Sequence, residues 1–185
     1  MNTRQLNAIK RIVSKRGKKL KEWSFANLFV DKNTGKLSAT DSYVAVVFDS
    51  HTDSDIEKFV ADDKFNFIGK DSDKPTPNMV SLFDKFNHFW NDTKNYDGVD
   101  YSNGLVLDTF VTDVVDEAKR AKKNGDKHII KFGTGYNPNY MRNVCEAIGN
   151  KGVSLFFPVN GRSPIFVMGE YGIGLVMPVN LNYPN

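Results

Sequence analysis

The sequence is short of cysteine and of long apolar stretches. Its 185 residues include one cysteine, Cys145, so no disulfide can form within the chain. No uninterrupted apolar run approaches the length of about 18 residues that a membrane-spanning helix needs, and the basic N-terminus lacks the apolar core of a secretory signal. We therefore expect a cytoplasmic protein that does not bind membranes.

Recognisable catalytic motifs are also missing. The sequence contains no Gly-x-Ser-x-Gly nucleophile turn and no Walker-type phosphate loop. Its three histidines, His51, His88 and His128, are scattered and follow no zinc-ligand spacing. Cys145 falls on the apolar side of a predicted helix, which favours a core thiol over a nucleophile. We expect no enzymatic activity and no cofactor, although a small enzyme with an unrecognised site stays open as an alternative.

One acidic segment could in principle bind a metal ion. Asp49, His51, Asp53, Asp55 and Glu57 alternate along the chain. The segment lacks the glycine turn of a calcium-binding EF-hand loop, because Ile56 and Glu57 stand where that turn is needed. A solvated acidic loop is therefore the favoured interpretation, and no metal site is predicted.

Charge is distributed unevenly along a chain of ordinary globular composition. Hydrophobic residues make up 40% of the sequence, and 14 Phe, 7 Tyr and 2 Trp are enough to fill one core. Residues 1–22 hold eight Lys or Arg and one acid, residues 49–117 hold six bases and sixteen acids, and residues 118–185 hold nine bases and three acids. The basic ends could neutralise phosphate groups, or they could simply be solvated helix faces.

Hydrophobic periodicity predicts an α+β protein in which one plan occurs twice. Residues 3–16 are predicted as a helix that Thr3 caps, followed by strands at 24–30, 36–40 and 43–49. A second helix begins at Asn137-Pro138 and ends near Gly149. Strands at 153–157, 163–168 and 173–178 follow it, and further elements are expected at 64–68 (strand), 79–90 (helix), 111–118 (helix) and 128–132 (strand). We interpret 1–185 as a single domain with unit one at about 1–70, an insertion at about 71–125 and unit two at about 126–185.

Several segments resemble a known family. FGTGYNPNYM at 132–141, VSLFF at 153–157, SPIFV at 163–167 and GLVMPVNL at 174–181 occur in the order of the last repeat of bacterial DNA sliding clamps, the β subunit of DNA polymerase III. GKLSATDSYVA at 35–45 resembles the Ala-Thr-Asp-Gly-His-Arg-Leu-Ala strand and turn of the same family. The resemblance implies a DNA-clamp-like fold, in which two helix-plus-antiparallel-meander units pack as one domain.

The resemblance also implies a non-catalytic function. Sliding clamps are rings whose inner helices face the DNA phosphates without reading the base sequence. Their clients insert a short peptide into a pocket beside the Ala-Thr-Asp-Gly turn and the Met-Pro segment. This chain departs from the family in being too short for three domains, and in carrying Ser42, Tyr43, Val44 and Asn180 where the family has Gly, His, Arg and Arg.

These arguments define two sets of candidate residues. The predicted DNA-binding set consists of Arg4, Arg11, Lys15, Lys18, Lys19, Lys21 and Arg142. The predicted partner-peptide pocket consists of Thr40, Ser42, Tyr43, Met177, Pro178 and Val179, which could instead simply complete the sheet and core.

The main hypothesis is a clamp relative that binds or encircles duplex DNA without sequence specificity, as a homo-oligomer, and that supports replication processivity. Replication or repair proteins that carry a clamp-binding peptide are its expected further partners. The alternative is a protein-interaction module or clamp mimic that binds replication proteins without encircling DNA.

Overall fold

The structure, a computed structural model, describes residues 2–13, 27–52, 58–61, 67–70, 79–80, 83, 95–96, 99–100 and 105–179. The helices in this part are α1 (Thr3–Ile12), α3 (Val111–Asn124) and α4 (Pro138–Ile148), and none is long and apolar enough to cross a membrane. The strands are β1 (Asn27–Val30), β2 (Lys36–Thr40), β3 (Val44–His51), β4 (Lys58–Ala61), β5 (Phe67–Lys70), β6 (Asn95–Tyr96), β7 (Val99–Asp100), β8 (Leu105–Phe110), β9 (Ile129–Lys131), β10 (Thr134–Tyr136), β11 (Gly152–Phe157), β12 (Ile165–Gly169) and β13 (Gly172–Val176).

Nine of these strands form one antiparallel sheet in the order β5-β4-β1-β2-β3-β13-β12-β11-β8. The first meander is β1-β2-β3 and the second is β11-β12-β13, as the sequence predicts. They join where β3 pairs with β13, in a register that sets Val46 opposite Gly174. The two repeated units therefore share one continuous sheet, and the predicted α+β class with two helix-plus-meander units is confirmed.

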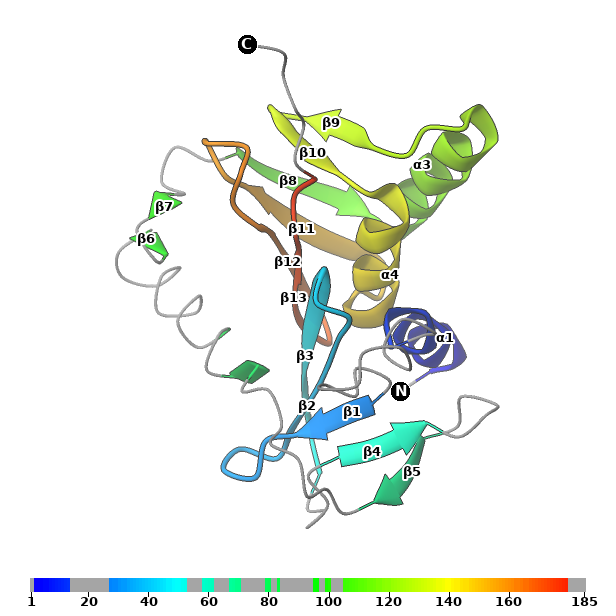
Figure 1. Ribbon diagram of the computed structural model, residues 1–185, viewed down its shortest axis with the longest axis vertical. Helices are drawn as coiled ribbons and strands as arrows, with labels where there is room; N and C mark the ends of the chain where they lie inside the picture. The colour runs from blue at the N-terminus through cyan, green and yellow to red at the C-terminus, as the bar shows by residue number, and fades with distance from the viewer. Residues whose placement is uncertain are drawn as a thin grey trace.

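Helices α1, α3 and α4 form a single layer against one face of this sheet. α4 lies between α3 and α1, and it also contacts β3, β12 and β13 (Figure 1). One hydrophobic core fills the space between the helices and the sheet, with Ile9, Val144 and Leu155 among its buried side chains. A smaller cluster on the opposite face includes Val47, Phe83 and Phe166. Burial on both faces explains why the central strands are almost continuously apolar.

Local sequence signals position α4 as predicted. The side chain of Asn137 accepts hydrogen bonds from the backbone N–H groups of Asn139 and Tyr140, Pro138 occupies the first helical position, and Gly149 ends the helix. The predicted cap of α1 is wrong by one residue. Asn2, not Thr3, caps α1, because its side chain and that of Gln5 bond to each other's backbone N–H groups in a capping box.

The segment predicted as an insertion, at about 71–125, contributes a strand to the shared sheet. Within it, β8 pairs with β11 over its whole length, from Leu105 opposite Phe157 to Phe110 opposite Gly152. α3 follows directly and packs against α4. The sequence analysis does not predict β8. This strand is the end strand of the sheet, and its apolar residues, such as Val106, stay exposed and do not alternate with polar ones.

Candidate nucleic-acid interface

Arg4, in the first turn of α1, is held by the end of α4. Its guanidinium donates hydrogen bonds to the carbonyl oxygens of Gly149 at 2.8 Å and Asn150 at 2.6 Å. Carbonyl groups at a helix C-terminus lack partners within the helix and carry partial negative charge, so a cation there stabilises the end of α4. Arg4 belongs to the predicted DNA-binding set, and the structure shows that its charge is already used to join α1 to α4.

Arg11 is engaged by α4 in a similar way. Its guanidinium forms an ion pair with Glu146 and donates a 2.7 Å hydrogen bond from Nε to Oδ1 of Asn143. Arg142, also predicted to bind DNA, donates from Nε to the same Glu146 carboxylate at 3.1 Å. Burial, together with the neighbouring Arg142, lowers the pKa of Arg11, and Glu146 partly offsets this effect. Two guanidinium groups share one buried carboxylate, so one positive charge remains uncompensated in this group.

The other predicted DNA-binding residues, Lys15, Lys18, Lys19 and Lys21, lie outside the described residues. Within the described part of α1, Lys10 is the remaining cation, and it makes no ion pair with any described residue. α1 contains no acidic residue between Thr3 and Ile12. The described end of α1 is therefore purely cationic, even with Arg4 and Arg11 bound to α4.

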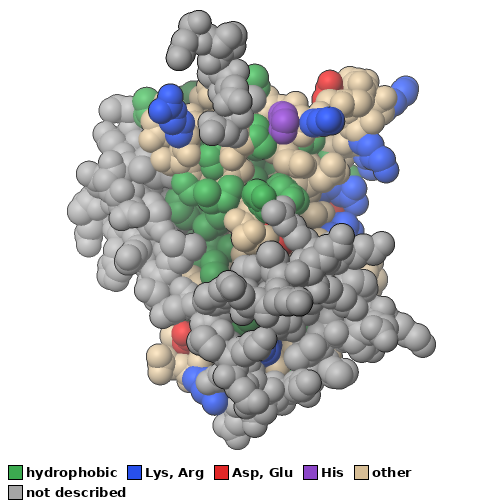
Figure 2. Space-filling view, viewed as in Figure 1, with side chains coloured by type: hydrophobic (Ala, Val, Ile, Leu, Met, Phe, Trp, Pro, Cys, Tyr) green, Lys and Arg blue, Asp and Glu red, His purple; other side chains and the backbone are tan. Residues whose placement is uncertain are grey.

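A second cationic group lies on α3 and was not included in the predicted set. Lys119, Arg120, Lys122 and Lys123 are all exposed on its C-terminal half. Only Lys119 forms an ion pair with another described residue, at 2.9 Å from Asp116, and this contact lowers the pKa of Asp116. Lys and Arg side chains line the upper right edge of the molecule, where α3 lies (Figure 2). The sequence signal was the run Lys-Arg-Ala-Lys-Lys at 119–123, typical of a helix C-terminus.

The predicted peptide-pocket residues come together at the junction between β3 and β13. The turn before β3 is built by Asp41, whose carboxylate accepts hydrogen bonds from the backbone N–H groups of Tyr43 at 2.9 Å and Val44 at 3.0 Å. Ser42 has a φ of 75° in this turn. That left-handed conformation favours glycine, which the clamp family carries at this position.

The Met-Pro segment at the end of β13 continues alongside this turn. The N–H group of Met177 donates to the carbonyl oxygen of Tyr43 at 2.8 Å, and that of Val179 donates to Gly135 at 2.9 Å. The Tyr43 ring stacks on Tyr140 with 5.7 Å between ring centroids. Tyr43 and Met177 remain 37% and 39% exposed, so they form an apolar surface patch that we call the Tyr43–Met177 patch. Thr40 is buried below the turn, where its hydroxyl donates to the carbonyl oxygen of Val44.

The described residues present few groups suited to catalysis. Burial raises the pKa of the Cys145 thiol, which therefore stays protonated and unreactive at neutral pH. The hydroxyl of the buried Tyr136 donates a hydrogen bond to the Glu117 carboxylate. Burial raises the pKa of the Tyr136 hydroxyl as well. No group of three or more His, Cys, Asp or Glu side chains in the described part of the chain is placed to hold a metal ion. Of the acidic segment at 49–57, Asp53, Asp55 and Glu57 lie outside the described residues.

Comparisons with known proteins identify the fold. No protein-family model and no curated protein sequence matches the chain. Among solved structures, the Helicobacter pylori beta clamp bound to a DNA ligase peptide matches with a TM-score of 0.58 at 13% sequence identity, covering 96% of this chain and 63% of the clamp chain. The Caulobacter crescentus beta sliding clamp matches with a TM-score of 0.61 at 13% identity, covering 96% and 62%. The Thermotoga maritima DNA polymerase III beta subunit matches with a TM-score of 0.58 at 11% identity, covering 95% and 63%.

The match extends over nearly the whole chain but over less than two thirds of each clamp. With so few identical residues, the likeness extends to the backbone arrangement and not to individual side chains. The chain has the fold of the bacterial DNA polymerase III β clamps.

Proposed function

We propose that the chain is a non-catalytic, cytoplasmic clamp-like protein that binds duplex DNA without sequence specificity and acts as an oligomer. The observation that carries this proposal is the layer of helices α3, α4 and α1 on one face of a clamp-like sheet, with cations at both ends. Lys10 on α1 and Arg120, Lys122 and Lys123 on α3 have no ion-pair partner among the described residues. Such exposed cations suit phosphate contacts, which hold a duplex without reading its bases.

Equilibrium DNA binding measured at several salt concentrations tests this proposal. Fluorescence anisotropy with two labelled duplexes of equal length and unrelated sequence should give equal affinities. For four to six phosphate contacts, the logarithm of the association constant should fall against the logarithm of salt concentration with a slope of about −4 to −5. Affinity that survives high salt, or that differs between the two duplexes, would contradict the proposal.

The cations of α3 make better test positions than Arg4 or Arg11, because replacing either arginine would also disturb its contacts with α4. We expect Lys122→Ala and Lys123→Ala each to weaken binding of both duplexes equally and to reduce the salt slope by about 1. Arg162→Ala is the matched control, since Arg162 is exposed on the β11–β12 loop and lies on none of the helices α1, α3 and α4. Equal losses in all three variants would show only a general charge effect.

The proposed oligomer follows from the open ends of the sheet. β5 and β8 are its two terminal strands, and among the described residues each pairs with a strand on one side only. Pairing β5 of one copy with β8 of the next would join copies head to tail, the arrangement that closes into a ring. Light scattering over a wide concentration range should find an assembly that persists on dilution. A monomer at every concentration would rule out a self-assembled ring.

A second function, binding a partner peptide without encircling DNA, is favoured by the Tyr43–Met177 patch. This patch brings together the two segments that resemble the family's client pocket. The H. pylori beta clamp, which has a similar fold, was solved with a DNA ligase peptide bound. A labelled clamp-binding peptide should bind the wild-type chain and lose affinity with Met177→Ser. Retained peptide binding in a chain that shows no DNA binding at low salt would establish this second function in place of the first.

A further inference from the structure

A pocket opens on the sheet face that points away from the helices, beside the terminal strand β8. Its volume is about 620 Å³, and residues of β8, β11, β12 and the first turn of α3 line it. Asp108, Ser154 and Met168 lie at one register position across the three strands, so their side chains share this face. Met168 packs against the smaller hydrophobic cluster, so the strand part of the pocket lies on the face opposite the helix layer, and the pocket reaches the first turn of α3 at Asp113.

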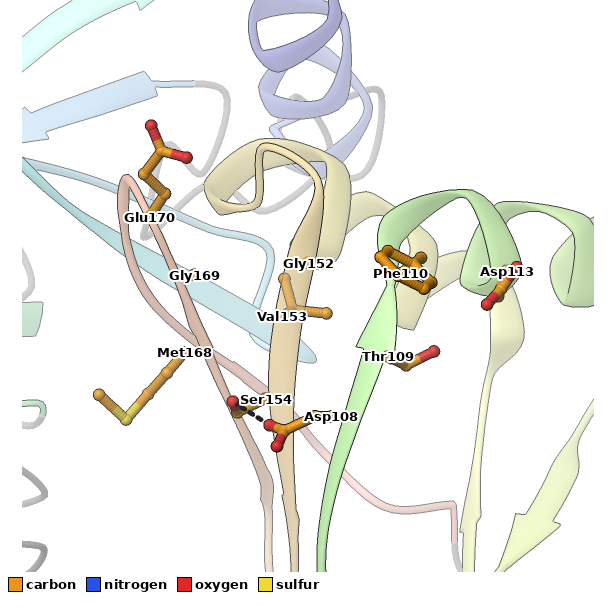
Figure 3. Close-up of a pocket in the computed structure, with 10 residues that line it drawn as sticks. All are labelled: Asp108, Thr109, Phe110, Asp113, Gly152, Val153, Ser154, Met168, Gly169 and Glu170. Atoms are coloured by element: carbon orange, nitrogen blue, oxygen red, sulfur yellow. Dashed lines mark hydrogen bonds between the residues drawn. The ribbon is translucent and has the colours of Figure 1, made fainter.

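The pocket combines apolar surface with negative charge. Phe110 is 63% exposed, and Met168 adds a flexible apolar side chain. Asp108, Asp113 and Glu170 contribute three carboxylates, and none of the lining residues is Lys, Arg or His. Asp108 and Ser154 lie in the middle of the pocket, Phe110 and Asp113 on one side, and Met168 and Glu170 on the other (Figure 3).

These groups select an occupant that is both apolar and cationic. The hydroxyl of Ser154 donates a hydrogen bond to Asp108, so this carboxylate is held in place before any ligand arrives. An Arg or Lys side chain over the exposed face of Phe110 would gain a cation–π contact and ion pairs with Asp108 and Asp113. DNA is excluded as an occupant, because three carboxylates would repel its phosphates.

We propose that this pocket binds a short basic segment of a partner protein, in which Arg or Lys residues flank one large apolar side chain. The cation lies against Phe110 between the carboxylates, and the apolar side chain lies against Met168. The charge of the pocket is opposite to that of the helix layer, so the site accepts a partner that neither the proposed DNA surface nor the Tyr43–Met177 patch would recognise. The segment binds the face of β8 and not the backbone edge through which a neighbouring copy would pair.

The test uses the full chain and a labelled peptide of alternating Arg and Leu residues. A second peptide, in which Glu replaces every Arg, is the charge-reversed probe. Anisotropy should show saturable binding of the Arg peptide only. Asp113→Asn combined with Glu170→Gln should weaken it at least about fivefold, since both charges act at close range. Phe110→Ser should do the same through loss of the aromatic contact. Asp126→Asn is the matched control, because Asp126 is exposed and does not line the pocket.

Circular dichroism confirms that each variant is folded, and DNA affinity measured in parallel separates this proposal from the proposed function. Phe110→Ser should bind duplex DNA as the wild-type chain does. Failure of peptide binding with intact DNA binding overturns the pocket proposal alone. Equal affinity for the Arg and Glu peptides, or an equal loss with Asp126→Asn, also overturns it.

Discussion

Replacing Gly174 with alanine tests how closely α4 packs on the sheet. A methyl group at this position on β13 would stand 2.3 Å from Cγ1 of Val144 on α4 and 3.2 Å from the carbonyl oxygen of Ala45 on β3. Neither neighbour can easily move, because Val144 is fully buried and the Ala45 carbonyl belongs to the strand paired with β13. Overpacking of this kind costs about 1–3 kcal/mol in free energy of unfolding. At about 2–4 °C per kcal/mol for a chain of this size, the melting temperature should fall by about 2–12 °C.

Urea unfolding followed by circular dichroism measures this change, and a double variant identifies its cause. Val144→Ala alone should cost roughly 2 kcal/mol, because it leaves a cavity. Combined with Gly174→Ala, it should cost at least about 1 kcal/mol less than the two single effects together, because the added methyl fills the vacated space. Gly152→Ala is the control, since its nearest new contact is an ordinary 3.5 Å from the carbonyl oxygen of Thr109. A neutral Gly174→Ala, or strictly additive effects, would refute the close packing of α4.

Three further predictions concern other contacts. Arg4→Ala should lower the free energy of unfolding by about 1–3 kcal/mol, because two carbonyl groups at the end of α4 lose a charged donor; an unchanged urea midpoint would contradict this. Ser42→Val should destabilise the chain by about 1–2 kcal/mol, because a φ of 75° suits β-branched residues poorly, whereas Ser42→Gly should be tolerated in the same assay. Burial raises the pKa of Cys145, so its contribution to stability is complete below the unfolded-state pKa of about 8.5 and declines above it by about 1.4 kcal/mol per pH unit. Urea midpoints from pH 7 to 10 should show this decline in the wild type and a shallower one in Cys145→Ala.

Local signals explain which elements were predictable. The Asn137-Pro138 start of α4 and its end at Gly149 depend on contacts within a few residues, so the sequence alone locates them. The six strands of the two meanders carry enough apolar residues to be recognised without their partners. β8 was missed because its apolar residues reflect its position at the end of the sheet, which depends on pairing with a segment more than forty residues away.

The candidate DNA surface shows the limit of helix periodicity. A helical projection places Arg4 and Arg11 on the polar side of α1, and the structure agrees with that placement. The projection cannot show that α4 lies against part of this side, with free carbonyl groups at its end and the Glu146 carboxylate in reach. The exposed cations of α3 were visible as a basic run, but nothing in their spacing indicated that α3 would join the same helix layer.

The sequence by itself determined the α+β class, the repeated helix-plus-meander plan and the start of α4 at Asn137, because each depends on periodicity or on neighbours along the chain. Only the tertiary structure decided that the two meanders join through β3 and β13, which brings Tyr43 and Met177 together across more than 130 residues of sequence. It likewise decided which arginines pair with α4 and which cations stay exposed. The physical reason is that a charge's partners and a strand's neighbours are set by distances in space, which sequence separation does not specify.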